Sequence, residues 1–297
     1  MTDADIRPVI FGEVLYDCFP EGEVVPGGAP FNVAWHLQGL GLSPLFISRV
    51  GDDPLGHRVR DIMEHRGMST AGLQLDSAHP TGKVNISLSG GSHSFDILPE
   101  QAYDYIVDDA LPPLPEGALF YHGSLAARNP VSAATLSQLC ERYDSNRLVD
   151  VNLRAPWWQR DTVLGMLEGA RLVKLNDEEL GELAPAASGD AASMRQLIDK
   201  AGLQELVVTR GANGAELMTG SGEIYRVVPE SATHVVDTVG AGDALTSVLI
   251  LGLLQDWSYS VILERAQAFA SAIVGHRGAT VEAADFYQPF VEAWEQS

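Results

Sequence analysis

Residues 235–254 (VVDTVGAGDALTSVLILGLL) are the stretch whose residue types and spacing point most directly to chemistry. A short apolar run leads into 237–243, and an almost wholly apolar helix is expected over 241–254. The two glycines allow a sharp backbone turn at the mouth of that helix. Free N–H groups there carry the positive end of the helix dipole and suit an anion, such as a phosphoryl group in transfer. Because a helix without a polar face must be buried, its first turn would be held rigidly.

Asp243 has two interpretations at this point. It can simply cap the helix, where a carboxylate contributes about 1 kcal/mol. Beside an anion site, a carboxylate can also accept the proton of a hydroxyl group whose oxygen attacks a phosphoryl group. Other catalytic signatures are missing from the sequence: the third glycine of a dinucleotide fingerprint, G-x-x-x-x-G-K-[ST], H-E-x-x-H and G-x-S-x-G.

Six segments, in this order, resemble the ribokinase-like (PfkB-type) family of carbohydrate kinases, and bacterial fructokinase-type members in particular. They are residues 27–34 (GGAPFNVA), 40–41 (LG), 51–56 (GDDPLG), 176–179 (NDEE), 209–214 (TRGANG) and 237–243 (DTVGAGD). The last segment matches the family signature [DN]-T-x-G-A-G-D. The resemblance covers residues 12 to about 280 and implies an ATP-dependent kinase that phosphorylates a sugar hydroxyl.

The resemblance also implies roles for individual residues around the transferred group. Asp243 would be the base that activates the sugar hydroxyl. The anion hole for the phosphoryl group would be formed by Gly240, Ala241 and Gly242.

On the sugar side, the resemblance implies that Asp17, Gly28 and Asn32 hydrogen-bond sugar hydroxyls. Carboxylate and amide groups suit this task because they make several directional bonds. The alternatives are an ordinary loop carboxylate for Asp17 and a helix cap for Asn32. Arg154 lies in 150–154 (DVNLR), which resembles a fructokinase stretch, and would clamp a sugar or phosphate oxygen; its alternative is an ion pair with Asp150 or Asp161.

On the nucleotide side, Asn176 and Glu179 would organise Mg²⁺ through water. Acidic residues at 177–179 also suit the first turn of a helix through its dipole alone. A monovalent cation such as K⁺ is the other expected ion, with Asp237 as its candidate ligand. Thr209, Gly211, Gly214 and His276 would lie along ATP, and Gly278 belongs to the same C-terminal segment; the alternative for Gly211 and Gly214 is a plain turn.

The elements that must position these residues alternate between strand and helix, which predicts an α/β fold with a mainly parallel sheet between helices. Strands are expected at 8–11, 44–50, 118–122, 147–151, 172–175 and 205–209, and antiparallel strands at 215–218 and 223–228. Helices are expected at 31–40, 53–66, 131–143, 177–183, 191–201, 241–254, 258–275 and 284–295. Residues 1–297 are interpreted as a single ribokinase-like domain.

Two regions, about 13–26 and 81–98, interrupt the alternation and predict a small β-sheet lid. Within the second region, residues 81–88 (TGKVNISL) alternate in polarity, and Gly90-Gly91 marks a hairpin turn. Because such a lid has an unpaired edge, dimerisation through it is a further expectation.

Charge and composition exclude several classes. With 19 Lys and Arg against 40 Asp and Glu, the net charge of −21 disfavours nucleic acid and anionic membrane surfaces as partners. Two cysteines form no disulfide framework or zinc cluster. The chain opens without a basic-then-apolar segment, so a cytoplasmic protein is expected.

Together these features predict a sugar kinase whose first candidate acceptor is fructose. Ribose, 2-keto-3-deoxygluconate and nucleosides are alternative acceptors. A non-catalytic sugar or nucleotide sensor on the same fold is the alternative from another class; it would be expected to lack the base or the anion-hole glycines.

Overall fold

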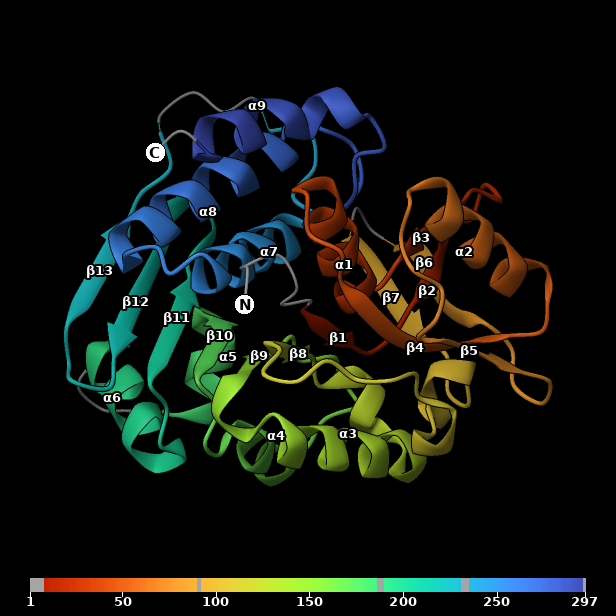
Figure 1. Ribbon diagram of the computed structural model, residues 1–297, viewed down its shortest axis with the longest axis horizontal. Coiled ribbons are helices and arrows are strands. Elements are labelled where there is room, and N and C mark those ends of the chain that lie inside the picture. The colour runs from red at the N-terminus through yellow and green to blue at the C-terminus, as the bar shows by residue number, and fades with distance from the viewer. Residues whose placement is uncertain (1–7, 90–91, 186–189, 231–234, 296–297) are drawn as a thin grey trace.

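The computed structural model describes residues 8–89, 92–185, 190–230 and 235–295, and its main feature is one large sheet (Figure 1). The strands of this sheet are β1 (Val9–Phe11), β4 (Leu45–Gly51), β5 (Leu73–Asp76), β8 (Phe120–His122), β9 (Arg147–Asp150), β10 (Leu172–Asn176), β11 (Glu205–Thr209), β12 (Ala215–Thr219) and β13 (Ile224–Val227). Their order is β13-β12-β11-β10-β9-β8-β1-β4-β5. All neighbours pair in parallel except β11–β12 and β12–β13, which are antiparallel.

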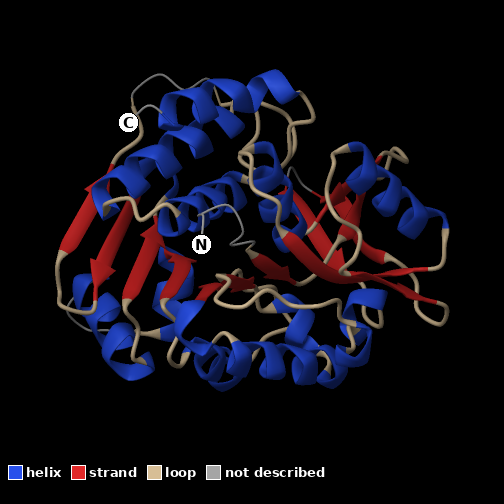
Figure 2. Cartoon of the chain, viewed as in Figure 1, coloured by secondary structure: helices blue, strands red, loops and turns tan. Residues whose placement is uncertain are grey.

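Helices cover both faces of this sheet, as Figures 1 and 2 show. The helices are α1 (Ala29–Gly39), α2 (Pro54–His65), α3 (Pro130–Arg142), α4 (Arg160–Leu167), α5 (Asp177–Leu183), α6 (Asp190–Ala201), α7 (Ala241–Leu254), α8 (Tyr259–Ile273) and α9 (Ala284–Glu295). Short 3₁₀ turns lie at Ala102–Tyr105, Asp108–Ala110, Leu125–Arg128, Asp144–Asn146 and Gly211–Asn213. One face carries α1, α7 and α8, and the other carries α3 to α6. Among the described residues, every helix is too short or too polar to cross a membrane.

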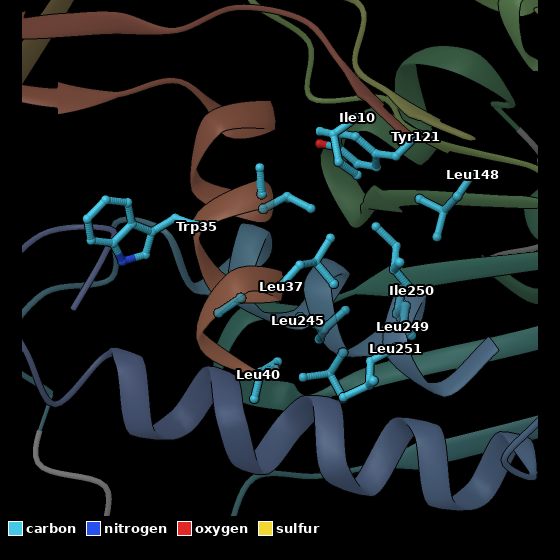
Figure 3. Close-up of a cluster of buried hydrophobic side chains, with 14 of the residues drawn as sticks. Ile10, Trp35, Leu37, Leu40, Tyr121, Leu148, Leu245, Leu249, Ile250 and Leu251 are labelled. Atoms are coloured by element: carbon cyan, nitrogen blue, oxygen red, sulfur yellow. The ribbon is translucent and has the colours of Figure 1, made fainter. Parts of the chain in front are cut away.

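The largest apolar core lies between the sheet and helices α1, α7 and α8. In Figure 3, side chains of α1 and α7 meet those of β1, β8 and β9, for example Leu37, Leu249 and Ile10. Residues 244–253 of α7 are all buried, as the apolar character of this helix predicts. This burial fixes the first turn of α7 against the sheet.

A second sheet confirms that the two interrupting regions belong together. It consists of β2 (Leu15–Cys18), β3 (Val24–Gly27), β6 (Gly82–Ser89) and β7 (Ser92–Ile97), in the order β3-β2-β6-β7. β6 and β7 form the expected antiparallel hairpin, whose turn at residues 90–91 lies outside the described residues, and β2 pairs with β6 in parallel. The predicted fold class is therefore confirmed: a mainly parallel sheet between helices, with a small additional sheet.

Candidate active site

The candidate site lies at the carboxyl ends of the parallel strands. β1 sits between β4 and β8, so the chain runs outward from β1 in both directions across the sheet. Such a switch point leaves a crevice at the carboxyl edge where ligands bind. Glu13 follows β1, Arg154 follows β9, Glu179 follows β10, and Thr209 ends β11. The fold thus brings residues from distant parts of the sequence to one edge.

The first turn of α7 is the predicted anion site, and its backbone geometry can be described directly. Gly240 precedes the helix with φ 80° and ψ −5°, and a Cβ there would lie 2.4 Å from the Cα of Ala279. Only glycine fits this left-handed, tightly packed position. The N–H of Ala244 donates to the carbonyl of Gly240 at 2.9 Å, so the N–H groups of Gly242 and Asp243 are left without helical partners.

The carboxylate of Asp243 does not cap α7, so the capping interpretation is wrong. Asp243 stands in the third position of the helix, and the helix start has no side-chain cap. Instead, Asp243 Oδ2 accepts a hydrogen bond of 2.8 Å from Nδ2 of Asn32, which is 211 residues away in sequence. The carboxylate is therefore oriented by α1.

The electrostatic surroundings give Asp243 a pKa suited to a base. Burial raises its pKa from 3.8 to about 6; the hydrogen bond from Asn32 and the charges of Lys174 and Arg154 oppose that rise, whereas Asp150 adds to it. At neutral pH the carboxylate is ionised, and its proton affinity lies close to the working range of a general base.

Asn32 is likewise not a helix cap. The residue before α1 is Gly28, with φ 105°, and a Cβ there would lie 2.7 Å from the carbonyl oxygen of Glu13. This close approach requires glycine. Asn32 lies one turn further on, and its buried Oδ1 has no partner among the described residues. That oxygen is available to accept a hydrogen bond from a ligand hydroxyl.

Asp17 and Arg154 come together with Asp243 at this edge. Asp17 lies on β2, its Oδ2 is 3.3 Å from the position of a Cβ on Gly27, and burial raises its pKa to about 6. The charge of Arg154 lowers the pKa of Asp17 and also that of Asp243. Arg154 is exposed in the loop after β9. Among the described residues Asp150 pairs with Lys174, not with Arg154.

Sequence reasoning missed two buried charged residues at the site, Glu13 and Lys174. Glu13 is 3% exposed, its Oε2 has no partner among the described residues, and burial raises its pKa from 4.5 to about 7. Lys174 lies on β10 with Nζ 3.1 Å from both carboxylate oxygens of Asp150. The sequence feature that could have identified them is a charged residue within an apolar strand or shortly after it, as in 172–176 (LVKLN).

Asn176 and Glu179 form a reciprocal cap at the start of α5. Asn176 Oδ1 accepts from the N–H of Glu179 at 2.8 Å, and Glu179 Oε2 accepts from the N–H of Asn176 at 2.9 Å. Glu179 Oε1 accepts from the N–H of Leu153 at 2.7 Å, and burial raises the pKa of Glu179.

The donor set at Glu179 fits a magnesium ion bound through water. Within the described ranges, no group of three or more His, Cys, Asp or Glu side chains could hold a metal directly. Each carboxylate oxygen has a second lone pair beyond its backbone partner. Mg²⁺ keeps several waters and needs few protein ligands, so a single carboxylate suits it.

The predicted nucleotide residues lie in two places. Thr209 pairs in register with Asn176 across β10 and β11, while Gly211 and Gly214 belong to the turn that leads to β12. His276 is exposed after α8 and packs edge-on against the ring of Phe286 at 4.9 Å.

Asp237 is bound by backbone groups of both segments that flank the start of α7. Its Oδ1 accepts from the N–H of Val239 and its Oδ2 from the N–H of Gly278, each at 3.0 Å. The loops before α7 and after α8 are therefore tied together through this carboxylate.

Comparisons with known proteins cover nearly the whole chain and agree with its fold. Residues 10–285 match the pfkB family carbohydrate kinase domain. The chain is 31% identical over 259 residues to a fructokinase of Klebsiella pneumoniae, covering 82% of this chain and 83% of the relative. It is 29% identical over 289 residues to an aminoimidazole riboside kinase of Salmonella typhimurium, covering 91% and 89%. A fructokinase double mutant of Vibrio cholerae, with fructose, ADP and potassium ion bound, superimposes with a TM-score of 0.85 at 25% identity, covering 97% and 99%.

Proposed function

The chain belongs to the PfkB family of carbohydrate kinases, and we propose from this premise that it is a fructokinase, transferring the γ-phosphoryl group of ATP to a fructose hydroxyl. One observation carries the chemical part of the proposal. A carboxylate with a pKa of about 6, oriented by Asn32, stands beside the N–H groups of Gly242 and Asp243, which have no partner within the helix.

The reaction is an in-line transfer. Asp243 accepts the proton of the sugar hydroxyl as that oxygen forms a bond to the γ-phosphorus. The bond from the γ-phosphorus to the β–γ bridging oxygen breaks, and ADP leaves with that electron pair. The backbone of Gly240, Ala241 and Gly242 receives the transferring group, where fixed dipoles stabilise developing charge. Asp243 then releases its proton to water.

The residues proposed to bind the sugar provide hydrogen-bond acceptors and one cationic donor. Asp17 and the unpaired Oδ1 of Asn32 accept hydrogen bonds from sugar hydroxyls, and the tight turn at Gly28 lets the backbone approach the sugar. Arg154 donates to sugar oxygens. The fructokinase relatives support fructose as the acceptor.

ATP lies along Thr209, Gly211, Gly214 and His276 in this proposal, at the β11 side of the site. Mg²⁺, held through water at Glu179 beside Asn176, would screen the negative charge of the phosphates. K⁺ is proposed near Asp237, because its carboxylate links the two loops that flank the start of α7.

The small sheet would act as a lid that excludes water, which otherwise competes with the sugar as acceptor. We also propose a cytoplasmic homodimer formed through this sheet, whose residue Phe95 on β7 is 58% exposed. Light scattering of the purified protein measures the dimer directly.

The test is ADP release from ATP and magnesium across fructose, ribose, glucose, 2-keto-3-deoxygluconate, adenosine and aminoimidazole riboside, with the Asp243→Ala variant alongside. We expect turnover on fructose, and a loss of several orders of magnitude in the variant. The riboside belongs in the panel because a riboside kinase is among the relatives.

Other outcomes would each overturn a different part of the proposal. Turnover on a different sugar overturns fructose as the acceptor. Undiminished turnover in Asp243→Ala overturns the assignment of the base. A protein that is stabilised by a sugar but turns over none of the panel would favour a sensor.

A further inference from the structure

A buried lysine lies directly beneath the first turn of α7. The side chain of Lys174 is 10% exposed, and its Nζ is 3.1 Å from both carboxylate oxygens of Asp150. A Cβ on Gly242 would lie 3.1 Å from the same Nζ. The ammonium group is therefore in contact range of the turn that would receive the phosphoryl group.

Thr246 links this ion pair to α7. Its Oγ1 lies 2.9 Å from Asp150 Oδ2 and 2.9 Å from the carbonyl oxygen of Gly242. The first turn of α7 thus rests on a connected set of polar groups that come from β9 and β10.

A buried ion pair is a poor device for stability. Desolvation of the two charges offsets their attraction, and apolar side chains of similar size usually stabilise a fold as well or better. The position of the pair therefore calls for a functional explanation. Lys174 remains charged: burial lowers its pKa, but the charges of Asp150, Asp243 and Glu179 outweigh that effect and raise it.

We propose that Lys174 is a positioning residue for phosphoryl transfer, which rests on the proposed kinase function. Its ammonium group holds the first turn of α7, and with it the carboxylate of Asp243, in the reactive arrangement. It also places a fixed positive charge beneath Gly242, where negative charge grows on the transferring group. Such fixed charges act mainly on the transition state, because they require no reorganisation during the reaction.

The test compares Lys174→Met with the double variant Lys174→Met/Asp150→Asn. The single change leaves Asp150 buried without its partner and is expected to unfold more easily, which a melting curve shows. The double change removes both charges and keeps similar side-chain volumes. It therefore separates the cost of leaving Asp150 without a partner from the proposed role of Lys174 in phosphoryl transfer. Lys200→Met is the matched control, because Lys200 is exposed on α6.

For the folded double variant we expect kcat to fall about 100-fold, the loss typical when a reacting group is displaced by about 1 Å. KM for ATP and for the sugar should change by less than about threefold, because the contacts that bind both substrates equally in the ground state and the transition state are unchanged. Calorimetry supplies a readout without turnover: affinity for ADP with aluminium fluoride and sugar should fall, while affinity for ADP alone stays the same.

The pH profile adds a second criterion. The charged and titratable groups that act on Asp243 from the surrounding elements are Glu13, Tyr121, Asp150, Arg154 and Lys174, and neutral Asn32 donates a hydrogen bond to it. Lys174 lowers the pKa of Asp243 and Asp150 raises it. In Lys174→Met the acidic limb of kcat/KM should therefore move to higher pH, whereas in the double variant it should stay near that of the wild type.

The outcomes separate this proposal from the proposed function. If the wild-type protein turns over a sugar and the double variant matches it in kcat and in aluminium fluoride affinity, Lys174 only neutralises Asp150 and the proposal is overturned. If the wild-type protein turns over no sugar, the kinase assignment itself fails, and the role of Lys174 falls with it.

Discussion

Replacing Asn32 with leucine should move the pH dependence of the reaction by a predictable amount. Leucine has a similar volume but cannot donate to Asp243 Oδ2, which now accepts a 2.8 Å bond. A hydrogen bond to a charged group contributes about 1.5–3 kcal/mol. Since a pKa change of one corresponds to about 1.4 kcal/mol, the pKa of Asp243 should rise from about 6 to about 7–8.

The sign follows from the requirement for an ionised base. With a pKa of about 7, roughly a quarter of the carboxylate is ionised at pH 6.5, against about three quarters for a pKa of 6. We therefore expect Asn32→Leu to lower kcat/KM about threefold or more at pH 6.5 through ionisation alone. KM for the sugar should also rise, because the substitution removes Oδ1.

The assay is the pH profile of kcat/KM from ADP release at saturating ATP. Asn146→Ala is the control, because Asn146 lies at the start of β9, at the opposite edge of the sheet. An acidic limb that stays near pH 6 in Asn32→Leu would refute the reasoning. It would mean that Asn32 does not set the proton affinity of the base.

Three further predictions follow from individual contacts. Gly240→Ala forces a Cβ within 2.4 Å of Ala279 and keeps a positive φ, so we expect a loss of about 1–3 kcal/mol in urea unfolding and a lower kcat; unchanged stability would show that the turn can relax. Burial raises the pKa of Glu13 from 4.5 to about 7, which corresponds to roughly 3 kcal/mol. The folded protein therefore holds the protonated form more tightly than the unfolded chain does, and this contribution to stability is present below pH 4.5 and lost as the pH rises through 7. We therefore expect the free energy of unfolding of Glu13→Gln, measured in urea relative to that of the wild type, to be higher at pH 8 than at pH 5. The same difference between variant and wild type at both pH values would contradict this. Arg154→Met should raise KM for fructose about tenfold with a smaller effect on kcat, because a charged donor to the sugar is lost in both the bound state and the transition state. Steady-state kinetics in which only kcat changed would contradict a contact between Arg154 and the sugar.

Much of the fold was predictable because its signals are local. The apolar run at 241–254 matches α7 in both bounds, and each strand candidate lies within about a residue or two of an observed strand. β5 (Leu73–Asp76), α4 (Arg160–Leu167) and the short 3₁₀ turns were not predicted, and β2 and β3 were predicted only as the region 13–26. The run LQLD alternates between apolar and polar residues, but it is only four residues long. Its polar residues Gln74 and Asp76 are buried while Leu75 is exposed, the reverse of what the alternation would suggest.

The site was predictable only where a motif marked it. Asp243 and Asn32 were identified separately, but their contact spans 211 residues and no local pattern predicts it. Lys174 and Glu13 escaped notice because their importance depends on which strands are neighbours. Lys174 matters because β9 brings Asp150 beside it and α7 lies above, and these are consequences of strand order.

The charge distribution of the site explains how so acidic a chain can accept a polyanion and which sugars suit it. Burial raises the pKa values of Glu13, Asp17 and Asp243 to between about 6 and about 7, so negative charge there is already costly. An acceptor that arrives with hydroxyl donors relieves this cost, since it satisfies carboxylate and amide oxygens that lack partners. An acceptor with its own carboxylate adds a further negative charge to this group of carboxylates, which the charges of Arg154, Arg128 and Lys174 offset only in part, because the pKa values stay raised. We therefore expect the site to prefer a neutral polyol such as fructose over an acid such as 2-keto-3-deoxygluconate. The first turn of α7 and the ammonium group of Lys174 supply positive potential on the side where we propose that the phosphates lie.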